Sequence, residues 1–309
     1  MTSPFDMSDA VLPSRVQLCD VGPRDGFQFE DRFIPTARKL DIIAALADAG
    51  LPRLQVASFV HPKWVPQMRD AEAVCAGLPD RETIFAGLVL NPKGLQRALA
   101  TDLTHIDLSI ATHDRHSYDN ANMSVVEAVQ QAEAMVADAH DAERTVQMGF
   151  QTVFGYQEPG DTPLGLVVEL SQRFADLGVA ELSLADSTGM ANPRMIQRRV
   201  DAVRAAIGDT PIVLHLHDTR GLGLANVYAA LEVGVTRFDT SLAGMGGCPF
   251  IDGATGNIAT EDTAYLMQQL GIETGVDIAA VAAASNEMET FLETSFPGTY
   301  HRLQREAMG

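Results

Sequence analysis

The amino-acid sequence predicts an α/β protein with the (β/α)8 TIM-barrel fold and a C-terminal helical extension. Short apolar runs of β-like composition alternate with longer amphipathic stretches rich in alanine and leucine along most of the chain. A doubly wound open sheet produces the same alternation, but its usual Gly-x-Gly-x-x-Gly turn is missing after the first strand. Residues 22–26, with the sequence Gly-Pro-Arg-Asp-Gly, stand there instead. The closed barrel is therefore favoured.

Eight strands are expected, and helical patterns fill the intervals between them. The strands are predicted at residues 16–21, 54–58, 84–90, 105–110, 146–153, 181–186, 212–217 and 237–241. The helices are predicted at residues 36–49, 70–77, 94–100, 124–140, 163–177, 193–207 and 223–233. Strands that alternate with helices in this way indicate parallel pairing, which a barrel of eight strands satisfies.

A glycine-rich loop, residues 244–256, follows the eighth strand, and three helical segments come after it. Two are predicted at residues 260–270 and 278–294, and the third is a short tail. Because no low-complexity linker separates them from the barrel, we expect one domain, with the barrel at residues 1–259 and its extension at 260–309. The extension is expected either to cap the barrel mouth or to form a subunit interface, which would make a homodimer.

The composition excludes several classes of protein. A chain of 309 residues, 46% apolar and 20% charged, can bury a large core. Its formal net charge of -19 repels phosphate backbones and anionic lipids, so neither a nucleic acid nor a membrane is an expected partner. The polar start has no signal-peptide pattern, which indicates a cytoplasmic protein. Three scattered cysteines, Cys19, Cys75 and Cys248, are expected to be reduced thiols.

Two histidines one residue apart, His215 and His217, stand at the end of the seventh predicted strand. Alternate residues of a strand point to the same face, so both imidazoles project together and form a metal-binding pair. Alone, the pair fits equally well two polar residues on a wet face. Barrel active sites lie at the C-terminal ends of the strands, however, and other reactive side chains fall there. These are Arg24, Asp25, Asp186, Cys248 and Asn257.

Asp25, His215, His217 and Asn257 would give two oxygen and two nitrogen ligands, a set that suits Mn²⁺, Mg²⁺ or Co²⁺ and leaves room for substrate. Arg24 is either one half of a solvated ion pair or, beside a cation, the group that holds the oxygen of a developing enolate. Cys248 is either a small buried side chain or a proton donor delivered by the glycine-rich loop.

Five sequence motifs resemble those of the 3-hydroxy-3-methylglutaryl-CoA lyases. They are VGPRDGFQ at residues 21–28, SFVHPKWVPQM at 58–68, HLHDT at 215–219, GMGGCP at 244–249 and GNIATED at 256–262. The resemblance runs in register from about residue 16 to 275. Several long motifs in the right order are much more specific than any one of them.

The resemblance implies a divalent-metal-dependent barrel lyase whose substrate is an acyl-CoA, with Mg²⁺ or Mn²⁺ as the expected ion. The reaction is a retro-Claisen cleavage that releases acetyl-CoA and needs no organic cofactor, because the thioester is the electron sink. Arg24 would stabilise the enolate, Cys248 would protonate it, and Asp25 or His215 would take the hydroxyl proton. Asp186 would support the metal ligands through a hydrogen bond. Substrate contacts are expected from Gln28, Asn91, Lys93, Gln55 and Arg220.

The chain departs from these lyases at three positions, where Gln55 and Asp20 replace glutamates and Arg220 replaces a tyrosine. One interpretation is a lyase for a differently branched or citramalyl-like CoA ester, with Arg220 facing a substrate carboxylate. Another is a protein that binds metal and acyl-CoA without efficient turnover. An aldolase or Claisen condensing enzyme of the same barrel group is a further alternative, although the loop with Cys248 favours the lyase.

Overall fold

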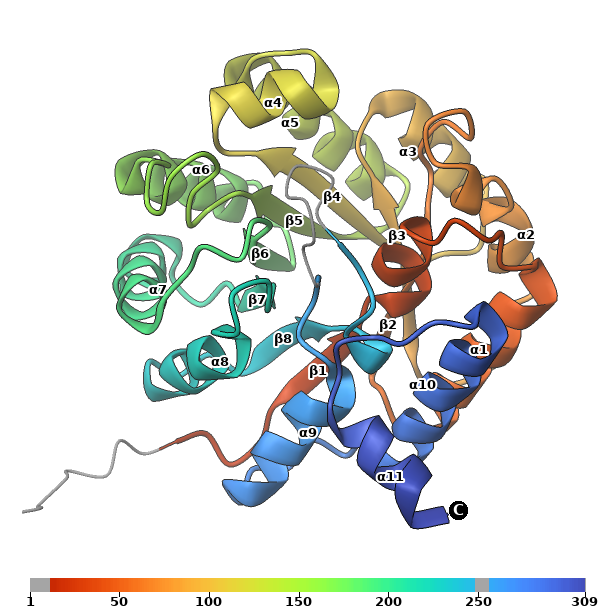
Figure 1. Cartoon of the computed structure of the whole chain (residues 1–309). Helices are drawn as coiled ribbons and strands as arrows, with labels where there is room; N and C mark the ends of the chain where they lie inside the picture. Colours follow the sequence, from red (N-terminus) through yellow and green to blue (C-terminus); the bar gives the residue numbers. More distant parts are fainter. Residues whose placement is uncertain (1–11, 248–255, 309) are drawn as a thin grey trace, which may run out of the picture.

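The computed structural model describes residues 12–247 and 256–308, and its strands form a closed parallel barrel in the order β1 to β8 (Figure 1). The barrel closes where β1 pairs with β8 in the register Leu18 to Phe238. This confirms the predicted (β/α)8 fold, with strand ends shifted by one or two residues. The strands are β1 (Gln17–Asp20), β2 (Arg53–Ser58), β3 (Ile84–Val89), β4 (His105–Ala111), β5 (Thr145–Gln151), β6 (Glu181–Asp186), β7 (Ile212–Leu216) and β8 (Arg237–Thr240).

A ring of helices surrounds the strands (Figure 1). It consists of α1 (Thr36–Asp48), α2 (Ala71–Ala76), α3 (Pro92–Leu99), α5 (Val125–Asp141), α6 (Leu164–Asp176), α7 (Pro193–Ile207) and α8 (Gly223–Glu232). Helix starts follow local sequence. Ser124 and Glu127 form a capping box at the start of α5, and Asn192 caps α7 by accepting a hydrogen bond from the backbone N–H of Met195.

One α-helix of the described chain, α4 (Asp114–Ala121), was not predicted. Its sequence, DRHSYDNA, has only two apolar residues, Tyr118 and Ala121, so the repeating pattern that identified the other helices is absent. The helix ends at Asn122, whose φ of 54° is left-handed, a conformation that asparagine tolerates. Because α4 directly follows β4, it lies over the C-terminal end of the barrel.

The strands separate an apolar core, which lies between the strands and the helices, from a polar region inside the barrel. Leu54 and Val56 of β2 belong to the apolar core that lies between the strands and the helices. Arg53 and Gln55 alternate with them and form buried polar contacts inside the barrel. The interior of the barrel is therefore polar around these residues, and it opens at the C-terminal ends of the strands.

The C-terminal extension comprises α9 (Thr260–Gln269), α10 (Ile278–Leu292) and α11 (Tyr300–Met308). These helices lie on the outside of the barrel, in the sector between α8 and α1 (Figure 1). Buried His301 lies between Glu261 of α9 and Glu289 of α10, at 3.1 Å and 3.0 Å from their carboxylate oxygens. No helix in residues 12–247 and 256–308 is both long and apolar enough to cross a membrane.

Candidate active site

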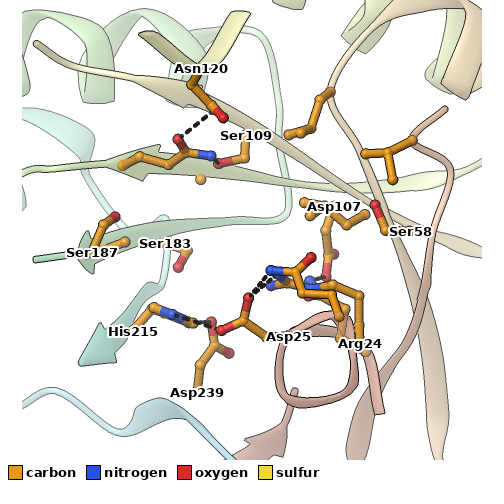
Figure 2. Close-up of a pocket in the computed structure, with 18 of the residues that line it drawn as sticks. Arg24, Asp25, Ser58, Asp107, Ser109, Asn120, Ser183, Ser187, His215 and Asp239 are labelled. Atoms are coloured by element: carbon orange, nitrogen blue, oxygen red, sulfur yellow. Dashed lines mark hydrogen bonds and ion pairs between the residues drawn. The ribbon is translucent and has the colours of Figure 1, made fainter. Parts of the chain in front are cut away.

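A cavity of about 510 Å³ occupies the mouth of the barrel at the C-terminal ends of the strands (Figure 2). Its polar lining comes from nearly every strand or the turn after it. The charged and imidazole side chains in the described lining are Arg24, Asp25, Asp107, His116, His215, His217 and Asp239. The position agrees with the location of active sites in barrel enzymes.

Arg24 and Asp25 enter the cavity from a tight π-helical turn, Gly22–Gly26, that follows β1. The backbone at Gly22 packs so closely that a Cβ there would lie 2.1 Å from the side chain of Leu242. Any larger residue would displace this buried side chain, so glycine allows the turn to pack closely here. The turn places both Arg24 and Asp25 in buried positions on the cavity wall.

The two histidines of the HLH motif meet the Asp25 side chain inside the cavity. The Nε2 atoms of His215 and His217 are 3.2 Å apart, and Asp25 Oδ2 is 4.0 Å from His215 Nε2. One potential ligand atom from each of the three residues lies within 4.8 Å of the others. The structure thus brings the predicted aspartate and both histidines together.

Asp239 orients His215 from the neighbouring strand. The two residues are register partners of β7 and β8, and Asp239 Oδ2 lies 3.3 Å from His215 Nδ1. A carboxylate on Nδ1 directs the other ring nitrogen, Nε2, towards the cluster. The sequence interpretation missed Asp239, and the available signal was its place near the end of a strand next to the histidine strand.

Asn257 joins the cluster from the segment after β8. Its Nδ2 donates to Asp25 Oδ2 at 2.7 Å and to the carbonyl of Met245 at 3.1 Å. Its Oδ1 is buried and has no hydrogen-bond partner in the described chain. A buried oxygen left without a donor beside a carboxylate and two imidazoles fits a bound cation, which would satisfy it. The residues present therefore suit a divalent metal ion.

The pKa values of the cluster favour metal-ligating protonation states. Burial, together with neighbouring His215, lowers the pKa of His217 to about 3, so its imidazole is neutral at physiological pH. Burial alone would raise the pKa of Asp25, but Arg24 and the two histidines outweigh this effect and the pKa is lowered. The site thus offers an ionised carboxylate and a neutral imidazole, the forms in which these groups bind metals.

A chain of hydrogen bonds runs from Arg24 into the barrel. Arg24 Nη1 donates to Asp25 Oδ1, and Arg24 Nε donates to Gln55 Oε1. Gln55 Nε2 donates to Asp107, which also pairs with Arg53. All five residues are buried. The sequence interpretation did not include Asp107 or Arg53.

Gln28 and Gln55 line the cavity, as expected of substrate-binding residues, and Gln28 donates to Asp25 at 3.0 Å. Asn91, Lys93 and Arg220 are not among the described residues of the cavity lining. The Asn91 side chain caps α3 by accepting from the Gly94 N–H at 2.9 Å. Lys93 is exposed, and Arg220 donates to the carbonyls of residues 188 and 189.

Asp186 accepts hydrogen bonds from the backbone N–H groups of Met190 and Ala191, at 2.8 Å and 3.1 Å. Its contacts in the described chain therefore stabilise a loop, and no hydrogen bond to the ligand residues is among them. Burial raises its pKa to about 6. Asp20 lies behind the cavity wall, where it accepts from Thr260 Oγ1, and burial raises its pKa to about 7.

Cys248 lies outside the described residues; Gly247, which precedes it, lines the cavity. Across the cavity from the histidines is a neutral polar wall that sequence reasoning missed. Asn120 of α4 donates to Gln151, which donates to Ser109 of β4 (Figure 2). Since α4 has no helical pattern in its sequence, nothing indicated that Asn120 would reach the site.

The fold and the site together define a barrel enzyme with a candidate cation site beside a fixed arginine. The model of the HMGL-like family matches residues 15–288. The chain belongs to this family.

Curated relatives cover nearly the whole chain. Hydroxymethylglutaryl-CoA lyase YngG of Bacillus subtilis is 38% identical over 92% of this chain and 96% of the relative. A Pseudomonas aeruginosa enzyme, named 3-hydroxy-3-isohexenylglutaryl-CoA/hydroxy-methylglutaryl-CoA lyase, is 36% identical over 90% of this chain and 93% of its own length. These relatives are carbon–carbon lyases, which agrees with the resemblance found in the sequence.

Solved structures give the same result. The crystal structure of the Bacillus subtilis HMG-CoA lyase superposes with a TM-score of 0.92 at 36% identity, covering 95% of this chain and 99% of that one. An Acinetobacter baumannii HMG-CoA lyase in complex with coenzyme A and 3-methylmalate gives a TM-score of 0.89 at 34% identity, covering 98% and 96% of the two chains.

Proposed function

We propose that this protein is a carbon–carbon lyase that cleaves a 3-hydroxy-3-methylglutaryl-CoA-like thioester into acetyl-CoA and a keto acid. The observation that carries the proposal is the convergence of Asp25, His215 and His217 beside Arg24 in the barrel mouth. The relatives named as HMG-CoA lyases, and the coenzyme A bound in one of them, support an acyl-CoA substrate.

Asp25, His215, His217 and Asn257 would hold a divalent ion, for which Mg²⁺ and Mn²⁺ are the proposed candidates. When bound, the ion would supply Lewis-acid polarisation of the substrate oxygens and make the 3-hydroxyl more acidic.

The cleavage itself requires a base near the 3-hydroxyl. Asp25 is ionised and His215 is oriented by Asp239, so each offers a lone pair and either side chain can accept that proton. As the O–H electrons form the new carbonyl at C3, the C2–C3 bond breaks. Its electron pair passes into the thioester as an enolate, and C2 then takes a proton to give acetyl-CoA. No oxidant, reductant or organic cofactor is needed for this balance.

Arg24 is suited to stabilise the enolate. Its guanidinium is buried and cannot lose its proton, and hydrogen bonds to Gln55 and Asp25 fix its plane on the cavity wall. A donor that is already oriented stabilises developing negative charge without reorganisation cost. Cys248, which lies outside the described residues, is the proposed proton donor to C2, on the strength of the GMGGCP motif.

The test is acetyl-CoA release from a panel of thioesters by the purified protein. The panel contains 3-hydroxy-3-methylglutaryl-CoA, a longer-branched 3-isohexenyl analogue and citramalyl-CoA, each assayed with Mn²⁺ or Mg²⁺ and with chelator. We expect release from at least one ester, abolished by chelator and restored by added metal. Absence of release from every ester by metal-loaded protein would contradict the proposal and favour a binding role.

A further inference from the structure

We propose that Asp107 is a positioning residue for Arg24 and that it acts through the side-chain amide of Gln55. The inference rests on the proposed function, because it assigns Arg24 the task of stabilising the enolate. Asp107 does not belong to the cation cluster or to any motif of the sequence analysis.

The contacts form a continuous path inside the barrel. Asp107 of β4 is 1% exposed and receives a hydrogen bond from Gln55 Nε2. Gln55 of β2, 3% exposed, accepts from Arg24 Nε. Figure 2 shows Asp107 and Arg24 on the same side of the cavity, facing the His215 side. The path therefore links the cavity arginine to a carboxylate on a different strand.

Arg53 anchors the other end of this path. Its Nη2 donates to Asp107, and its side chain lines a separate cavity of about 230 Å³ that residues from the N-terminal ends of the strands enclose. Asp107 thus lies in the wall of the active-site cavity, and Arg53 holds it from the N-terminal side of the barrel. An anchored, buried carboxylate of this kind holds its partners in a single arrangement.

The chemistry of Asp107 and Arg24, the two ends of the path, determines which group donates in each hydrogen bond between them. An ionised carboxylate only accepts and a guanidinium only donates, so the residue between Asp107 and Arg24 must present one donor and one acceptor. The glutamine amide meets this demand. A carboxylate at position 55 would instead face Asp107, and one of the two would have to take up a proton.

Replacing Asp107 by asparagine breaks the path in a different way. The new amide oxygen can accept from Arg53 or from Gln55, but the amide nitrogen then faces the other donor. If Gln55 turned over to compensate, its own nitrogen would face Arg24 Nε. One donor–donor contact remains in each arrangement, so Asp107→Asn should loosen the guanidinium of Arg24.

The double variant that combines Gln55→Glu with Asp107→Asn is called the swap below. It gives every donor along the path an acceptor again. The carboxylate introduced at position 55 would accept from Arg24 and from the amide introduced at position 107. The oxygen of that amide would accept from Arg53. The shapes are nearly unchanged, because each replacement exchanges only an amide and a carboxylate. The two single variants and the swap therefore form a double-mutant cycle that measures this one coupling.

The experiment measures kcat, KM and Mn²⁺ stoichiometry for the four proteins, and their unfolding in urea. We expect each single variant to lose about 10- to 100-fold in kcat, as for a misplaced catalytic group, with smaller changes in KM and full metal content. The swap should recover most of the lost kcat. Asp70→Asn, which removes a carboxylate from a half-buried pair with Lys39 away from the cavity, is the matched control and should leave kcat unaffected.

The outcomes separate this inference from the proposed function. If the swap restores unfolding stability but wild type cleaves no thioester, the coupling between positions 55 and 107 stands and the lyase assignment fails, together with the positioning role given to Asp107. If wild type is an active lyase and either single variant keeps wild-type kcat, Asp107 does not position Arg24. A swap that is as inactive as the single variants would overturn the inference as well.

Discussion

The Nε2 atoms of His215 and His217 lie 3.2 Å apart, so the two imidazoles face each other at hydrogen-bond distance within one buried cluster. The Nδ1 of His215 lies close to Asp239, which leaves its Nε2 directed at the cluster. A cation between two such nitrogens would replace the hydrogen bond that they otherwise share.

We therefore expect His217→Ala to lower Mn²⁺ affinity by about 100-fold or more. Loss of a residue that only supports a metal ligand already lowers metal affinity by about 10- to 100-fold, and His217 is a proposed direct ligand. Titration calorimetry or Mn²⁺ electron paramagnetic resonance measures the change. His113→Ala removes a histidine outside the cluster and is the control. Unchanged Mn²⁺ stoichiometry and affinity in His217→Ala would remove this residue from the ligand set.

Arg24→Lys tests the arginine while keeping its charge. A lysine ammonium lacks the planar fork that reaches both Gln55 and Asp25, so the charge loses its fixed position. We expect kcat to fall by about 100- to 1,000-fold with little change in KM, as when a preorganised oxyanion donor is removed. Steady-state kinetics measures this, with exposed Arg173→Lys as control. A fall in affinity alone would assign Arg24 to ground-state binding.

Periodicity was sufficient to predict all eight strands, because apolar β-rich runs recur between amphipathic helices. It also placed Asp25, His215 and Asn257 at one site, since parallel strands of a barrel end at the same face. It failed for α4, which has too few apolar residues to show a helical period, and hence for Asn120.

The supporting contacts of the site could not be predicted from the sequence, because they depend on strand register and on reach across the barrel. Asp239 lies beside His215 only in the register found between β7 and β8. Asp107 and Gln55 lie on strands that β3 separates, and their side chains meet in the interior. No spacing along the chain relates these residues.

Cys248→Ser tests the proposed proton donor. A serine hydroxyl is a much weaker acid than a thiol, so protonation of the enolate should slow, and we expect kcat to fall by about 100-fold or more. Mn²⁺ binding should be unchanged, because the thiol is not a proposed ligand. The buried thiol of Cys75 is not in the described cavity lining, and Cys75→Ser is the control. Full turnover in Cys248→Ser would rule out the role.

Asn91→Ala distinguishes a capping residue from a substrate contact. Because the Asn91 side chain accepts from the Gly94 N–H at the start of α3, its loss should lower the free energy of unfolding by about 0.5 to 2 kcal/mol. KM should stay at the wild-type value, since Asn91 is not part of the described cavity lining. Urea unfolding and steady-state kinetics measure the two quantities. A raised KM without loss of stability would support the substrate contact expected from the sequence.

His301→Gln tests the buried junction of the C-terminal extension. Burial alone would lower the pKa of His301, but the carboxylates of Glu261 and Glu289 outweigh it and raise the pKa above the ordinary value of 6.5. A proton bound more tightly by the folded state stabilises it fully below pH 6.5, and this stabilisation is lost as the pH rises through the folded-state pKa. The free energy of unfolding of the wild type should therefore decrease above pH 6.5.

The variant lacks this titration, so its deficit relative to wild type should be largest near pH 6 and narrow towards pH 9. Urea unfolding at a series of pH values measures both curves. Exposed His140→Gln serves as the control and should run parallel to wild type. If the difference in the free energy of unfolding stays constant across this range, His301 stabilises the junction by packing alone and not by ion pairing with the two glutamates.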